Sequence, residues 1–141
     1  HNIHYIHAYA EQIPMIDESF DIVAINFMLH EVPYIPRINI LQEAYRVLKP
    51  NGILVVLDIE PQKIINNLAF NQFRRWAFEV TEPHIYEYYQ HDMMDSIVQS
   101  GFDDVENYQN DPMNTLWIGK KSVWKVHPLR PDLVKPLFVY A

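Results

Sequence analysis

An imidazole and a carboxylate stand side by side where a long apolar segment stops. Residues 22–29 are almost entirely apolar, and His30 and Glu31 follow them directly. A second apolar run, ILVVLDI at residues 53–59, carries Asp58 next to its end. An imidazole can exchange a proton near neutral pH, and a neighbouring carboxylate can orient it. The pattern therefore indicates acid–base chemistry, while a polar pair that merely caps a loop is the simpler alternative.

Two strands joined by a helix are expected to position these side chains. Residues 20–27 read as a strand that is apolar on both faces, as in parallel sheets covered by helices on each side. Pro36 is expected to open a helix, which Pro50 ends before a turn at Asn51-Gly52. Such strand–helix–strand units are right-handed and parallel in nearly all cases. In open α/β sheets, ligands bind outside the carboxyl ends of the strands, which here release residues 7–14, 26–33 and 58–62.

The remaining periodicity predicts further elements around this unit. Phe73 and Trp76 are expected to face the core, although a lid over an apolar acceptor is an alternative use of the aromatic residues around them. The predicted elements are a strand over residues 2–7, a helix over 62–80, a helix from the N-cap Asp92 to Ser100 with Gly101 as its stop, a hairpin of strands 105–108 and 115–119 joined through Asp111-Pro112, and a Pro-containing tail over 122–141.

Composition excludes several classes of function. The chain has 141 residues, enough for one domain, and its net charge of −7 disfavours a nucleic-acid partner. No run approaches the roughly 18 apolar residues of a membrane span. The absence of cysteine fits a reducing, cytoplasmic setting. His1, His4 and His7 alternate between the faces of an extended segment, and His84, His91 and Asp92 are widely spaced, so we predict no metal site in either group.

Several motifs resemble those of class I S-adenosylmethionine-dependent methyltransferases, in the group that includes ubiquinone and menaquinone C-methyltransferases. The segment from Phe20 to Val23 resembles the FDLV element that opens the fourth strand of that fold. The segment LKPNG, ending at Gly52, resembles the LKPGG turn before the fifth strand. The resemblance is close over residues 3–60 and looser as far as Gly119.

The resemblance implies an α/β fold that is the C-terminal part of a Rossmann-like methyltransferase domain, over residues 1–121. We expect a mostly parallel sheet with a terminal antiparallel hairpin, and the first two strands missing because the chain is truncated at its N-terminus. The glycine-rich cofactor loop is absent, since the glycines at 52, 101 and 119 form no GxGxG. Residues 20–120 should then form a four-stranded remnant with an exposed edge, while residues 1–10 pack irregularly.

The same resemblance assigns roles to individual residues. Tyr9, Ala10 and Glu11 are similar to the Asp-Ala-Glu element that contacts the adenine of S-adenosylmethionine, with Tyr9 replacing the aspartate. Asn26 and Phe27 match positions beside the methionine and sulfonium part of this cofactor. Because the sulfonium already activates the methyl group, the protein mainly aligns the reactants and supplies a base for some acceptors. His30 is the expected base, with Glu31 orienting it or contacting the acceptor, and Asp58 is the second catalytic candidate.

The function that follows is methyl transfer to a small, apolar or aromatic acceptor by a longer parent enzyme, the fragment alone being inactive. A catalytically silent methyltransferase-like binding module is the first alternative, and Tyr9 in place of Asp is its best support. A nicotinamide-dependent Rossmann enzyme is the second, but it requires a GxGxxG after its first strand. An intact glycine-rich loop in the missing segment would favour the enzyme over the silent module. The oligomeric state stays open.

Overall fold

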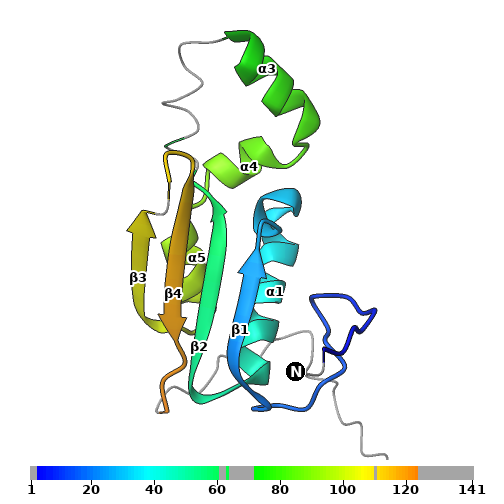
Figure 1. Cartoon of the computed structure of the whole chain (residues 1–141), viewed down its shortest axis with the longest axis vertical. Coiled ribbons are helices and arrows are strands. Elements are labelled where there is room, and N and C mark those ends of the chain that lie inside the picture. Colours follow the sequence, from blue (N-terminus) through cyan, green and yellow to red (C-terminus); the bar gives the residue numbers. More distant parts are fainter. Residues whose placement is uncertain (1–2, 61–62, 64–71, 110, 124–141) are drawn as a thin grey trace, which may run out of the picture.

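The computed structural model describes residues 3–60, 63, 72–109 and 111–123. Figure 1 shows how its strands and helices are arranged. The elements are β1 (Phe20–Asn26), the short 3₁₀ helix η1 (Leu29–Glu31), α1 (Tyr34–Val47), β2 (Leu48–Ile59), α3 (Gln72–Thr81), α4 (Ile85–Tyr89), α5 (Met93–Gln99), β3 (Asp103–Gln109) and β4 (Asn114–Lys120).

Four strands form one mixed sheet in the order β1-β2-β4-β3. β1 and β2 pair directly and run parallel, and α1 connects them along the chain, which confirms the predicted strand–helix–strand unit. β4 pairs with β2 and with β3 in antiparallel fashion. The expected four-stranded sheet over residues 20–120 is thus confirmed, with β1 at one edge of the order. The expectation of a mostly parallel sheet is wrong, because only one of the three strand pairs is parallel.

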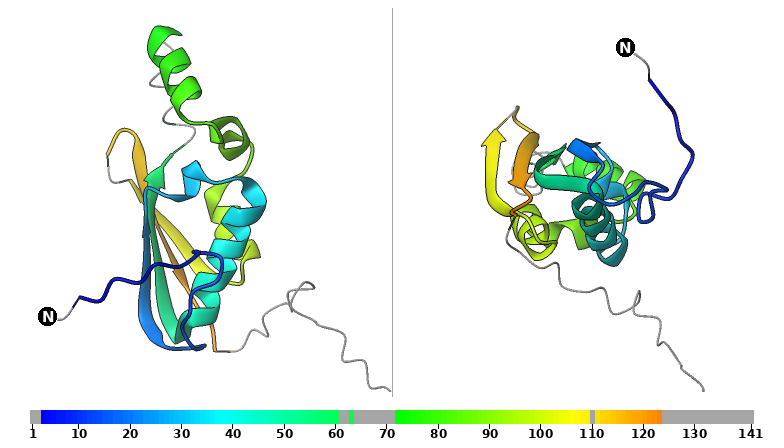
Figure 2. Two further views of the ribbon diagram at one scale, coloured as in Figure 1. Left: turned by 90° about the vertical axis from the view of Figure 1, so that its right-hand side faces the viewer. Right: turned by 90° about the horizontal axis from the view of Figure 1, so that it is seen from below.

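Among the described residues, helices cover one face of this sheet and none covers the other (Figure 2). Ile22 of β1 keeps 61% of its surface exposed and pairs in register with Ile53 of β2, which keeps 38%. The prediction that β1 is covered on both faces is therefore wrong for the part of the chain that the structure describes. The core lies between the sheet and helices α1, α4 and α5, and its fully buried apolar side chains include Leu29, Leu41, Leu54, Val56, Ile97 and Phe102.

The residues predicted to bound α1 and β2 lie partly inside these elements: α1 ends at Val47, and Pro50 lies within β2. Pro33 is the N-cap residue of α1, so the prediction that Pro36 opens the helix is wrong by two residues. Pro36 is tolerated because the amides of the first turn have no partner within the helix. The predicted turn is a bulge inside β2, where Asn51 has a φ of 63°. At Gly52 a Cβ atom would come within 2.8 Å of the Lys49 carbonyl oxygen, which explains the glycine.

The C-terminal elements match their prediction closely. Asp92 caps α5 by accepting a 3.1 Å hydrogen bond from the Asp95 amide. The helix stops before Gly101, whose φ of 108° suits glycine. The turn between β3 and β4 is held by Asp111, whose Oδ1 accepts from the amides of Met113 and Asn114. The short helix α4, which the periodicity did not predict, lies between α3 and α5.

The segment before β1 carries no regular strand. The strand predicted over residues 2–7 is absent from residues 3–7. Residues 3–8 are irregular, as expected, but they are exposed and do not pack against the fold. Beyond it, the chain is fastened to α1 through a buried carboxylate. Glu43 Oε1 accepts from the Ile13 amide at 2.8 Å and from Arg46 at 2.7 Å. Arg46 also pairs with Asp17 at 2.5 Å, so α1 holds both ends of this loop.

The described part of the helix predicted over residues 62–80 is α3, which projects beyond the carboxyl edge of the sheet (Figure 1). Phe73 and Trp76 keep 73% and 59% of their surface exposed, and their ring centroids lie 5.9 Å apart. Our prediction that they face the core is therefore wrong. Residues 64–71 and the tail from residue 124 lie outside the described residues, and among those described no helix is long and apolar enough to cross a membrane.

Candidate functional site

The carboxyl ends of β1 and β2 bring His30 and Asp58 into contact. His30 lies on η1, which follows β1, and Asp58 is the penultimate residue of β2. His30 Nδ1 lies 2.5 Å from Asp58 Oδ1, and the carboxylate is fully buried. The structure thus joins two of the three predicted catalytic residues, which are 28 positions apart in the chain.

Asp58 also fixes the loop that carries His30. Its Oδ2 accepts from the Leu29 amide at 2.9 Å, while its Oδ1 accepts from the Ile59 amide at 2.7 Å. A carboxylate that already accepts these hydrogen bonds is held in one orientation. It therefore favours the tautomer in which His30 Nδ1 carries the proton and Nε2 has the free lone pair.

The surroundings of His30 raise its pKa above the ordinary value. Burial by itself lowers the pKa, because it disfavours the charged imidazolium. The hydrogen bond and the negative charge of Asp58 outweigh burial, with smaller contributions from the charges of Glu31 and Glu82. The imidazole is therefore a stronger base than a free histidine side chain.

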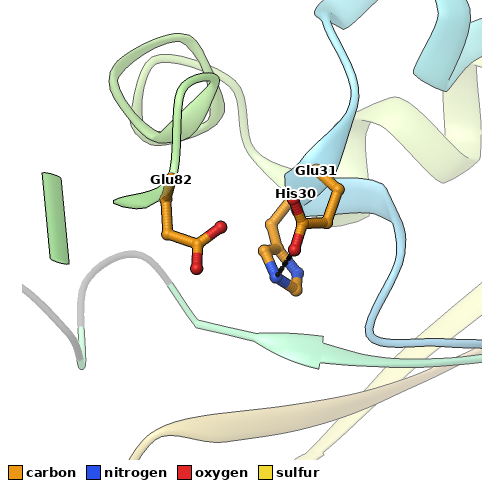
Figure 3. Close-up of side chains that lie close together, drawn as sticks. All are labelled: His30, Glu31 and Glu82. Atoms are coloured by element: carbon orange, nitrogen blue, oxygen red, sulfur yellow. Dashed lines mark ion pairs between the residues drawn. The ribbon is translucent and has the colours of Figure 1, made fainter. Parts of the chain in front are cut away.

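Glu31 and Glu82 lie beside this imidazole, on the side away from Asp58 (Figure 3). Glu31 Oε1 lies 3.6 Å from His30 Nε2, and half of the Glu31 side chain is exposed. Glu82 follows α3 directly and points toward the imidazole (Figure 3). One ligand atom from each of the three residues lies within 4.8 Å of the others. Within the described part of the chain, this is the group spaced to hold a cation, and it includes none of the histidines that the sequence analysis considered as metal ligands.

A buried arginine on α1 holds the loop that follows β1 and carries His30. Arg37 on α1 donates from Nε to the Leu29 carbonyl at 3.0 Å and from Nη2 to the Val32 carbonyl at 3.2 Å. Its guanidinium lies 4.5 Å from the ring centroid of Tyr88 on α4. Burial is the largest cause of both pKa shifts here. It lowers the pKa of Arg37 and raises the pKa of Tyr88 well above its usual value. The Tyr88 hydroxyl in turn donates to the Ile59 carbonyl at 2.9 Å, which ties α4 to the end of β2.

The sequence analysis missed Glu82, Arg37 and Tyr88. Arg37 occupies a helical position at which a charged residue ordinarily faces solvent. Glu82 follows a predicted helix next to Pro83, and its spacing from His30 carries no signal. Both lie near His30 only because α1 and the segment that follows α3 come together at the carboxyl ends of β1 and β2. Local patterning does not determine this arrangement.

Asn26 and Phe27 lie at the same edge, and Asn26 points to the open face of the sheet. Asn26 pairs in register with Leu57, so its side chain shares the face of Leu57, whereas Asp58 points to the helix-covered face. Phe27 has a φ of 48° and donates its amide to the Leu57 carbonyl at 2.8 Å. About half of its surface is exposed. Asn26 therefore lies on the opposite face of the sheet from Asp58, while Phe27 directly follows β1 at the same edge.

The third predicted group, residues 9–11, contacts α1. Glu11 Oε2 accepts a 2.8 Å hydrogen bond from Asn39. The Tyr9 side chain is 84% exposed, and its backbone forms an isolated bridge with Gln12. Ala10 packs against the edge of the core. Of these side chains, Tyr9 is the most accessible to a ligand.

Comparison of the sequence with known proteins assigns the chain to one family. The model of the ubiE/COQ5 methyltransferase family matches residues 1–109. A demethylmenaquinone methyltransferase of Listeria welshimeri is 40% identical over 81 residues, which cover 57% of this chain and 34% of the relative. One from Geobacillus stearothermophilus is 47% identical over 83 residues, or 59% of this chain and 33% of the relative. The chain thus spans about a third of these curated relatives.

Solved structures support the fold alone. The crystal structure of a putative methyltransferase from Bacillus halodurans superposes with a TM-score of 0.58 at 19% sequence identity. The superposition covers 84% of this chain and 71% of that one. The sheet and helices described above therefore have the architecture of a methyltransferase domain.

Proposed function

The chain belongs to the ubiE/COQ5 methyltransferase family, and from this membership we propose that it takes part in methyl transfer from S-adenosylmethionine to a small aromatic acceptor of the quinone type. The acceptor class follows the names of the Listeria and Geobacillus relatives. The observation that carries the proposal is the His30–Asp58 pair at the carboxyl ends of two parallel strands. Ligands of open α/β sheets bind at this edge.

The chemistry assigned to His30 is proton acceptance at Nε2. In a transfer to carbon, a ring carbon of the reduced acceptor forms a bond to the methyl group while the methyl–sulfur bond breaks. The products are the methylated acceptor, S-adenosylhomocysteine and one proton. His30 Nε2 takes the proton from the acceptor, and Asp58 stabilises the resulting imidazolium. Glu31 stands 3.6 Å from Nε2, where it can contact an acceptor hydroxyl.

The cofactor would lie on the open side of the same edge. Asn26 and Phe27 are proposed to contact its methionine and sulfonium part, while Tyr9, Ala10 and Glu11 are proposed to contact its adenine. Glu11 is already bonded to Asn39, so the exposed Tyr9 and the backbone of Ala10 are the stronger candidates within that group.

A glycine-rich loop would have to come from outside residues 1–141. The three glycines of the chain lie at positions 52, 101 and 119 and form no phosphate- or cofactor-cradling motif. We therefore propose that the chain acts within a longer polypeptide and binds S-adenosylmethionine poorly by itself. The open apolar face of the sheet, with Ile22 exposed, supports this view, because doubly wound sheets cover both faces with helices.

A silent binding module with the same fold is the second candidate. Its support is Tyr9, which replaces the aspartate expected at the adenine contact and projects into solvent. The two candidates differ in whether the protein binds the methyl donor at all.

Calorimetric titration of S-adenosylmethionine separates them. We expect the longer polypeptide to bind the cofactor and the 141-residue chain to release little heat. Binding to the longer polypeptide should weaken in Asn26→Ala and stay unchanged in Asn107→Ala, which changes an exposed side chain on β3, away from the proposed contacts. Absence of binding by the longer polypeptide would overturn the enzyme proposal in favour of the silent module.

A further inference from the structure

Three ligand atoms converge beside the imidazole at a spacing that suits a metal ion. His30 Nε2 and Glu31 Oε1 are 3.6 Å apart, which is too long for a hydrogen bond. Two ligands bound tetrahedrally at about 2.1 Å from one zinc ion lie about 3.4 Å apart. Glu82 completes the group within 4.8 Å, a gap that a small rotation of its long side chain can close.

The positioning of His30 is that of a metal ligand with an outer-shell partner. Metal-binding histidines almost always donate their second ring N–H to a carboxylate or carbonyl, which fixes the ring and its tautomer. Asp58 occupies this position on His30 Nδ1 and is itself held by the Leu29 and Ile59 amides. Nε2 is therefore left facing Glu31 and Glu82 (Figure 3).

Glu82 gives a second, independent observation. Its Oε2 atom is buried and has no hydrogen-bond partner among the described residues. A buried acceptor without a partner costs free energy, so such an atom in a native site calls for a ligand. The atom belongs to the same carboxylate that points at His30 (Figure 3).

The charges point to a cation. Glu31, Glu82 and Asp58 place three carboxylates around one imidazole. Within the described ranges, neither Glu31 nor Glu82 forms an ion pair with a lysine or arginine. A divalent ion would offset the repulsion between these carboxylates, in a setting where burial weakens screening.

We infer that His30 Nε2, Glu31 and Glu82 form a binding site for a divalent transition-metal ion of the zinc type. The mixed nitrogen and oxygen ligands favour such an ion over Mg²⁺ or Ca²⁺, which prefer oxygen alone. Three protein ligands leave a fourth position for water or for an oxygen of a bound molecule. One lone pair on Nε2 cannot hold a metal and accept a proton together, so His30 acts as a base only in the metal-free state, and bound Zn²⁺ would inhibit the methyl transfer proposed above.

Calorimetry with Zn²⁺ and with Mg²⁺ on the 141-residue chain tests this inference without relying on methyl transfer. We expect one Zn²⁺ site and no comparable Mg²⁺ site. Zn²⁺ should shift the ¹⁵N resonance of His30 Nε2, which separates this site from adventitious binding at exposed His4 and His7. Glu82→Gln should weaken binding about tenfold or more, and Asp58→Asn by about 10- to 100-fold.

Two further variants make the result unambiguous. Glu87→Gln removes a carboxylate five positions from Glu82 that is not part of the cluster, so it should bind Zn²⁺ as the wild type does. Glu31→Gln changes a side chain that is 52% exposed, so it preserves the fold while weakening the site. Wild-type affinity in both Glu82→Gln and Glu31→Gln, or an unmoved Nε2 resonance at saturating Zn²⁺, would overturn the inference.

Discussion

The guanidinium of Arg37 lies over the ring of Tyr88, 4.5 Å from its centroid, with both side chains buried beneath the candidate site. Arg37 holds the loop after β1 through the Leu29 and Val32 carbonyls, while Tyr88 holds the end of β2 through the Ile59 carbonyl. This stacked pair therefore couples the two strand ends that present His30 and Asp58. The rigidity of the site therefore depends on the guanidinium of Arg37, whose position no local sequence pattern predicts.

Replacing Arg37 should be costly. Arg37→Met removes two buried donors and leaves the Leu29 and Val32 carbonyls without them, so we expect a loss of about 2–4 kcal/mol in the free energy of unfolding. Lys49→Met removes an exposed cation that pairs with Asp21, and should cost less than about 1 kcal/mol. Urea denaturation measures both, and equal losses would contradict the role assigned to Arg37.

Two tryptophans offer a matched test of the fold. Trp117 on β4 is 3% exposed, whereas Trp76 on α3 is 59% exposed. Trp117→Ala should lower the free energy of unfolding by about 3–5 kcal/mol because it leaves a large cavity. Trp76→Ala should change it by only about 0.5 kcal/mol. A large loss at Trp76, seen by thermal or chemical denaturation, would mean that α3 packs against the core after all.

The bulge at the start of β2 predicts a steric effect at one glycine. Gly52→Ala would place a Cβ atom 2.8 Å from the Lys49 carbonyl oxygen, so we expect a loss of about 1–3 kcal/mol. Asn51→Gly in the same bulge should be neutral or slightly stabilising, because Asn51 has a φ of 63°. The pair separates crowding from backbone strain, and an unaffected Gly52→Ala would argue against this bulge geometry.

Asp58 should act on catalysis through His30. In the longer polypeptide, Asp58→Asn is expected to lower kcat by about 10²-fold, since the imidazolium loses its stabilising charge. The affinity for S-adenosylmethionine should stay unchanged, because Asp58 faces away from Asn26. Asp111→Asn, in the exposed turn before β4, is the matched control and should keep full activity. A parallel loss of cofactor affinity in Asp58→Asn would show that Asp58 has a general structural role instead.

Much of the fold could be predicted because its signals are local. The apolar runs, the turn residues Asn51-Gly52 and the cap at Asp92 each determine an element through contacts a few residues away. The proximity of His30 and Asp58 could also be predicted, since parallel strands present their carboxyl ends at one edge of the sheet.

What could not be predicted depends on which surfaces meet. Phe73 and Trp76 repeat at helical spacing, which indicates an apolar face but not whether another element covers it. The exposure of Ile22 has the same cause, because a strand apolar on both faces reads alike whether or not the second layer is present. Glu82 and Arg37 reach the site only through the packing of helices at one end of the sheet.

The central claim is tested most directly by methyl transfer from radiolabelled S-adenosylmethionine to a reduced quinone-type acceptor, catalysed by the longer polypeptide. We predict transfer by the wild type, a loss of about 10²- to 10⁴-fold in kcat for His30→Ala, and full activity for His91→Ala, whose imidazole stacks on Tyr34 instead. Undiminished transfer by His30→Ala, or no transfer by the wild type, would contradict the account.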